Sequence, residues 1–105
     1  MSSFAEYLKR QLKSTSNALG DTWTNTAQTH QWDESLHSAI KVVPHNNGVA
    51  LSYPSDLHET IISVEYGDGA PPRAAMRNFK EQAKPEVNKA VYKAYSEFLE
   101  SKGLF

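Results

Sequence analysis

The chain contains no cysteine, and none of its apolar runs approaches the length of a membrane span. Without cysteine there are no disulfides, thiolate zinc sites or thiol catalysis, which fits a reducing compartment. A helix needs about 20 consecutive apolar residues to cross a bilayer. The first residues, MSSFAEYLKRQLKS, also lack the continuous apolar stretch of a secretory signal. We therefore expect synthesis in the cytoplasm and no membrane partner.

Motifs for catalysis and phosphate binding are missing as well. The sequence has no Gly-x-Ser-x-Gly elbow, no phosphate loop, no Gly-x-Gly-x-x-Gly and no helical His-Glu-x-x-His. Asp56, His58 and Glu59 lie close in sequence and suggest a small metal-dependent hydrolase or nuclease, although they suit an exposed loop equally well. We expect no enzymatic activity and no cofactor, and keep the metal-dependent enzyme as the lesser alternative.

Charge is distributed unevenly along the chain, although the net charge is only -1. Residues 1–20 carry three bases and one acid, residues 21–72 one base and seven acids, and residues 73–105 seven bases and four acids. This is a weak footprint for nucleic-acid binding, which usually requires a basic face. An acidic middle between basic ends favours head-to-tail contacts between copies; a solvated surface of uneven charge is the alternative.

The length of 105 residues predicts a single domain. Its first element is expected to be a helix. Ser3 opens a capping box, and apolar residues near the helical period predict a helix over residues 3–18. Gly20 is a plausible stop or break. The threonine-rich residues 22–31 show no clear period and have mediocre helix propensity, so they are left without an assigned element.

The middle of the chain predicts a β-hairpin. The apolar β-branched run at 40–43 and the alternating apolar residues at 49–53 flank Asn-Asn-Gly at 46–48. Asn-Gly between two such runs is a strong hairpin signal. We expect strands at about 38–44 and 49–53. A further apolar segment at 61–64 is buried, as either a strand or a helix.

The C-terminal third predicts one long helix. Its apolar stripe repeats at spacings of three or four: Met76, Phe79, Ala83, Val87, Ala90, Val91, Ala94 and Phe98. The stripe keeps its phase across Pro85, which predicts a kink there, and Lys102-Gly103 predicts the C-terminal cap. The fold class is therefore α+β: an N-terminal helix, a small antiparallel sheet with a hairpin at about 38–53, and a long kinked C-terminal helix across the sheet.

The stretch IISVEYGDGAPPRAAMRNF at residues 61–79, called the elbow below, joins the sheet to the last helix. Its two prolines fix backbone torsions, whereas Gly67 permits torsions that other residues resist. Glu65 is expected to pair with Arg73 or Arg77, within the subunit or across a contact. Such an elbow suits a structural corner and equally a rigid hook that touches a neighbour.

Aromatic residues offer two interpretations. Trp23, Trp32, Tyr66, Tyr92 and Tyr95 could stack on nucleic-acid bases. Such residues are more often core or interface anchors. Because basic residues are not interleaved around them, packing is the favoured interpretation.

The elbow resembles a family signature. VEYG at 64–67, followed by PPRAAMR at 71–77, is similar to the Val-Glu-Tyr/Phe-Gly … Pro-x-Arg-Pro-Phe-Leu/Met-Arg pattern of small head–tail joining proteins of long-tailed bacteriophages. These are also called tail completion or neck proteins. LHSAIKV at 36–42 resembles the Leu-x-x-Ser-Ile-x-Val segment of that family, and the long C-terminal helix agrees. The resemblance covers residues 36 to about 100.

The chain also departs from the pattern. Ala74-Ala75 stand where the family tends to have Pro-Phe, and Thr60-Ile61 where it often has Tyr-Ala. The threonine-rich segment has no counterpart. These departures concern the detailed interface.

The resemblance implies a non-enzymatic virion protein at the head–tail junction, made in the cytoplasm of a bacterial host. It implies a homo-oligomeric ring that binds other neck, tail-terminator or tail-tube proteins. DNA would pass through the channel without specific binding, because an acidic lining repels phosphates. A monomeric adaptor that binds one protein partner is the alternative.

The interface or elbow-fixing residues that the resemblance implies, beside Val64, are Glu65, Tyr66, Gly67, Pro72, Arg73, Met76 and Arg77. Of these, Glu65, Arg73 and Arg77 are expected to make contacts or fix the elbow, and Tyr66 and Met76 to pack. Arg73→Ala or Glu65→Ala is then expected to block assembly while the monomer stays folded.

Overall fold

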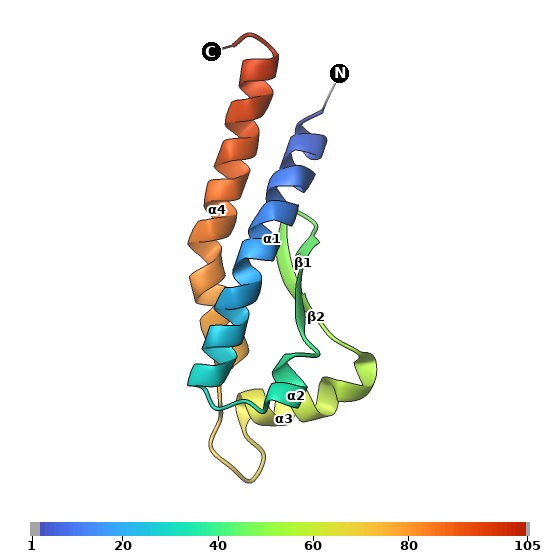
Figure 1. Cartoon of the computed structure of the whole chain (residues 1–105), viewed down its shortest axis with the longest axis vertical. Helices are drawn as coiled ribbons and strands as arrows, with labels where there is room; N and C mark the ends of the chain where they lie inside the picture. Colours follow the sequence, from blue (N-terminus) through green and yellow to red (C-terminus); the bar gives the residue numbers. More distant parts are fainter. Residues whose placement is uncertain (1–2, 105) are drawn as a thin grey trace.

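Two long antiparallel helices lie side by side, and a hairpin and short helices pack beside them (Figure 1). The computed structural model describes residues 3–104. In chain order the elements are α1 (Phe4–Thr29), α2 (Glu34–His37), β1 (Lys41–His45), β2 (Gly48–Ser52), the 3-10 turn η1 (Ser55–Leu57), α3 (His58–Tyr66) and α4 (Ala75–Ser101). The predicted α+β class is confirmed.

Helix α1 extends beyond the predicted stop at Gly20 and continues to Thr29, which corrects the expected break. Packing overrides the weak helix propensity of the threonines here. Trp23 is buried, with its ring centroid 5.8 Å from that of Phe79 on α4. The hydroxyl of Thr26 donates to the carbonyl one turn earlier at 2.7 Å, so this buried polar side chain is satisfied within the helix.

Caps form at both predicted helix ends, although of the capping box only the bond to Ser3 is present within residues 3–104. Ser3 Oγ accepts the N–H of Glu6 at 3.3 Å and so caps α1. At the end of α4, Gly103 has a φ of +70° and its N–H donates to the Glu100 carbonyl, while the next N–H donates to the Leu99 carbonyl. This pair of bonds is the Schellman motif.

The predicted hairpin is confirmed, with small changes at the strand ends. β1 and β2 pair antiparallel around a two-residue turn at Asn46-Asn47, and Asn46 adopts a φ of +51°. The apolar segment at 61–64, left open between strand and helix, is helical and belongs to α3. The sheet therefore has two strands within the described residues.

Helix α4 packs along α1, not across the sheet as expected. The hairpin lies beside α1 (Figure 1). It contacts α1 mainly through β1, which leaves β2 as the outer strand. Pro85 lies inside α4, and the helix continues past it as one element, as the sequence predicts. The local kink at Pro85 stays a prediction.

Two clusters of buried residues hold α1 and α4 together. The larger one, near the short helices, contains Leu19, Trp23, Ala27, Trp32, Leu36, Ile40, Ile61, Ala75, Phe79 and Ala83. The smaller one, near the termini, contains Leu8, Leu12, Ala90 and Ala94. Among residues 3–104, none of the helices combines the length and the hydropathy needed to cross a bilayer.

The aromatic residues divide into two groups. Trp23 and Trp32 are buried, which confirms packing for both. Tyr66, Tyr92 and Tyr95 are exposed on the surface and take no part in either buried cluster. These three tyrosines are therefore not core residues, and their role as interface anchors stays a prediction.

Gly20→Ala tests the continuity of α1. A methyl group at Gly20 meets no atom within 4 Å, so alanine should stabilise the helix by about 0.5–1 kcal/mol. The midpoint of thermal unfolding should rise by roughly 2–8 °C, as followed by circular dichroism. Gly103→Ala is the matched control and should destabilise, because Gly103 has a positive φ. A lower melting temperature for Gly20→Ala would instead indicate that the helix is interrupted at Gly20.

Candidate protein-interaction site at the elbow

Glu65 lies at the centre of the elbow and is 1% exposed. Its carboxylate accepts three hydrogen bonds: Met76 N–H at 2.7 Å, Arg77 N–H at 3.0 Å and Arg77 Nε at 2.9 Å. Arg77 Nη2 also donates to the Glu65 carbonyl at 2.6 Å. Of the two predicted partners, Glu65 therefore pairs with Arg77 and not with Arg73.

This carboxylate acts as the cap of α4. The N-cap residue, Ala74, offers no side-chain acceptor, so the N–H groups of the first turn need an acceptor from elsewhere. Glu65 accepts two of them, at Met76 and Arg77. A negative charge at a helix N-terminus also interacts favourably with the helix dipole. The start of α4 thus depends on a residue at the end of α3.

Arg73 joins the elbow to the end of α1. Its N–H donates to the Val64 carbonyl at 2.9 Å, and its own carbonyl accepts Trp32 Nε1 at 2.8 Å. Its guanidinium Nη1 donates to the Gln31 carbonyl at 2.9 Å. Although Arg73 is exposed, each of these bonds lies within the chain, and the two that its backbone makes hold the elbow in place.

Gly67 has a structural requirement for glycine. Its φ is +85°, and an added Cβ would lie 2.6 Å from the Ala70 carbonyl oxygen and 3.1 Å from the Pro72 nitrogen. Both atoms belong to the backbone, so a side chain at this position would force the loop apart. Gly67 and Pro72 therefore set the sharp return of the elbow after α3.

Tyr66 lies on the surface beside this network and is 55% exposed. Tyr66 was expected to pack, and it does so on the surface and not in the core. Its ring instead lies against Arg77, whose guanidinium carbon is 4.3 Å from the ring centroid. Such cation–π contacts are worth about 0.5–1 kcal/mol at exposed sites. Met76 is partly buried and packs against the larger cluster, as expected.

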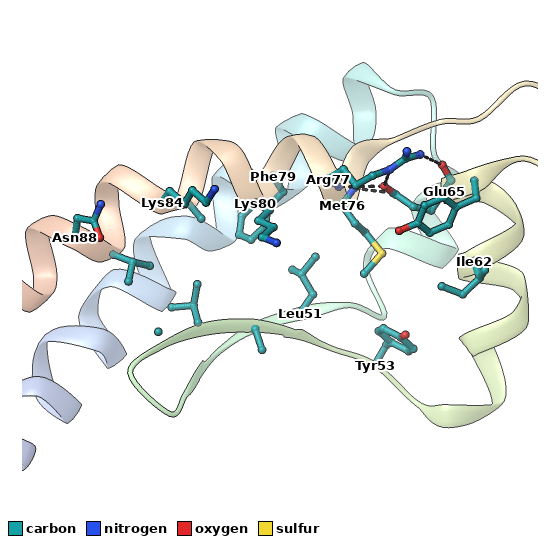
Figure 2. Close-up of a pocket in the computed structure, with 16 residues that line it drawn as sticks. Leu51, Tyr53, Ile62, Glu65, Met76, Arg77, Phe79, Lys80, Lys84 and Asn88 are labelled. Carbon is teal, nitrogen blue, oxygen red and sulfur yellow. Dashed lines mark hydrogen bonds and ion pairs between the residues drawn. The ribbon is translucent and has the colours of Figure 1, made fainter.

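A groove of about 600 Å³ opens between β2 and α4 next to the elbow (Figure 2). It is lined by Gly48, Val49, Ala50, Leu51, Tyr53, Ile62, Glu65, Tyr66, Met76, Arg77, Phe79, Lys80, Ala83, Lys84, Val87 and Asn88. Four of the seven predicted site residues are in this set: Glu65, Tyr66, Met76 and Arg77. Gly67, Pro72 and Arg73 lie in the loop beyond the groove.

The alternative metal site is not assembled. Asp56, His58 and Glu59 occupy η1 and the start of α3. Within residues 3–104 there is no group of three or more His, Asp or Glu side chains that could hold a metal ion. His58 instead stacks on Tyr53, whose hydroxyl lies 2.8 Å from His58 Nδ1.

Sequence reasoning missed several residues of the site. Trp32 was assigned to packing, but its role in binding the Arg73 carbonyl depends on the fold. The residues of β2 and α4 that line the groove contributed to the predicted strand and helix, but the sequence did not indicate that they line a common groove. Lys80 and Lys84 carry a usable signal, because a spacing of four places both on one face of α4.

Comparison of the chain with protein-family models, curated proteins and solved structures finds no match.

The burial of Glu65 changes the expected effect of its mutation. Glu65→Ala removes the cap of α4 and the carboxylate partner of Arg77, so it should lower the free energy of unfolding by about 3 kcal/mol. This argues against the expectation that the Glu65→Ala monomer stays intact. Glu65→Gln keeps one acceptor and should cost about half as much. Urea denaturation measures these differences.

Arg73→Ala is the control for this series. Because Arg73 is exposed and donates one side-chain bond to Gln31, its loss should cost about 1 kcal/mol or less. Wild-type stability for Glu65→Ala would show that α4 begins without the carboxylate.

Proposed function

We propose that this protein is a structural component of the head–tail junction of a long-tailed bacteriophage. It would act by oligomerising and by binding neighbouring neck, tail-terminator or tail-tube proteins. The observation that carries the proposal is the Glu65–Arg77 pair, which joins the VEYG part of the motif to its PPRAAMR part. Two short stretches that resemble the family signature thus form one bonded unit, and this supports treating them as a single motif.

The shape of the molecule gives independent support. Its accessible surface is 6862 Å², whereas a folded monomer of this mass exposes about 5,900 Å². Its radius of gyration is 16.4 Å, against about 13 Å for a compact domain of this length. An elongated chain with excess surface suits a subunit that buries part of this surface against neighbours.

The elbow divides into residues that shape it and residues that face outward. Glu65 is buried and Gly67 is held by its backbone conformation, so both would act by keeping the corner rigid. Tyr66, Pro72 and Arg73 are exposed, and we assign them to the contact with a neighbouring virion protein. Exposed aromatic and arginine side chains are enriched at such contacts.

DNA would pass through the assembly without specific binding. The exposed acids Asp56, Glu59 and Asp68 lie on and just after the short elements of the acidic middle segment. Carboxylates repel phosphates and release no counterions on contact, so a lining of this kind would give DNA no adhesive contacts.

Immunogold electron microscopy tests the location directly. Antibody against this chain should label the capsid–tail junction of particles from the source. Intact tailed particles without label there, with the chain found only in the soluble lysate, would remove the virion role. The monomeric adaptor would then become the leading function.

A complementation assay tests the contact residues. In a phage that lacks this gene, wild-type protein supplied in trans should restore tailed, infectious particles. Arg73→Ala should reduce their number at least tenfold, because it alters an exposed residue of the elbow at little cost in stability. Lys89→Ala, a change at another exposed base on α4, should restore assembly fully. Full assembly with Arg73→Ala would remove the site assignment but leave the location untouched.

A further inference from the structure

The outer edge of β2 presents unpaired backbone groups. The turn has two residues, so its closing pair, His45–Gly48, exchanges hydrogen bonds. Such pairs alternate along an antiparallel ladder, and Val49 and Leu51 therefore direct their N–H and C=O groups away from β1. Pro44 lies opposite Val49, a position where its missing N–H costs no ladder bond.

Nothing within the described chain covers this edge. The sheet of residues 3–104 ends at β2, and no backbone hydrogen bond links Val49 or Leu51 to a third segment. An open strand edge is a template for pairing with another chain. Here it is not protected by charged residues, because β2 has the sequence GVALS.

The open edge borders the groove between β2 and α4. Figure 2 shows Leu51 projecting from the hairpin into the space below α4, with Met76 reaching into it from the helix. Val87 adds a further apolar group from α4. A segment added to β2 would place every second side chain over the apolar side chains of Leu51, Met76 and Val87.

The α4 side of the groove is basic. Lys80 and Lys84 are both exposed, and Lys84 meets a carboxylate of its own helix, Glu81, at 3.6 Å. The one carboxylate that lines the groove, Glu65, is already paired with Arg77. The groove therefore has an excess of positive charge.

The spacing of the two lysines matches an extended ligand. Residues four apart on a helix rise by about 6 Å, and residues two apart on a strand by about 6.8 Å. Carboxylates at alternate positions of an added strand, on the face opposite its apolar side chains, would thus have a spacing that matches Lys80 and Lys84. Long lysine stems allow the ammonium groups to reach over the edge.

We propose that the β2–α4 groove binds an extended segment of a partner protein, paired with the edge of β2 and alternating apolar with acidic side chains. The strands of a second copy do not fit, because KVVPH and GVALS carry no carboxylate. This inference goes beyond the proposed function and does not depend on it, since it rests on the strand edge and the groove alone.

Nuclear magnetic resonance titration of the full chain tests the proposal with a synthetic peptide, acetyl-Glu-Val-Glu-Val-Glu-Val-amide. The amide signals of Val49 and Leu51 should shift and their hydrogen exchange should slow. The same peptide with N-methyl groups on alternate residues should not bind, because its backbone no longer pairs with the edge. This control leaves the protein unchanged and so does not depend on a variant that folds.

Charge reversal tests the role of the two lysines on the α4 side of the groove. Lys80→Glu with Lys84→Glu should weaken binding about fivefold or more. Lys89→Glu with Lys93→Glu makes the same change in net charge on α4 outside the groove and should leave binding unaltered. Lys-Val-Lys-Val-Lys-Val should bind more weakly than the acidic peptide.

Three results would overturn the proposal. Val49 and Leu51 signals that do not move at peptide concentrations of about 1 mM would exclude even weak binding. Equal binding of the N-methylated peptide would exclude strand pairing. Concentration-dependent protection of the same two amides in the free protein would show that a second copy occupies the edge.

Discussion

A single buried carboxylate bonds α3 to α4. Glu65 lies in the last turn of α3 and accepts the N–H groups of Met76 and Arg77 at the start of α4, so two helices that meet at a sharp return are joined through one side chain. Arg77 balances the charge and bonds back to the Glu65 backbone. A charge removed from water to this degree requires such complete pairing. This arrangement fixes the first turn of α4 relative to the end of α3, while the two buried clusters hold the rest of α4 on α1.

The elbow and the groove are consequently two parts of one surface. Arg77 belongs to both, since it pairs with Glu65 and packs on the exposed ring of Tyr66. A change that weakened the bonds of Glu65 would move the α4 side of the groove and also the loop between α3 and α4.

Elements with a local cause were predicted well from the sequence. The caps at Ser3 and Gly103 and a turn within residues 46–48 each require particular residues at particular positions, and all three form, with Asn46-Asn47 as the turn and Gly48 already in the strand. The continuation of α1 past Gly20 was missed because Trp23 and Ala27 are stabilised by contacts with residues far along the chain. The candidate residues of the elbow were found by motif, but which of them are buried was not.

Sequence pattern alone was sufficient for the α+β class, the hairpin and the single C-terminal helix, because periodicity and capping act between residues close in the chain. The pairing of Glu65 with Arg77, the packing of α4 on α1 and the open edge of β2 beside a basic groove became visible in the folded chain alone. These features arise from contacts between residues that are distant in sequence, whose energies depend on burial and geometry that no local pattern records.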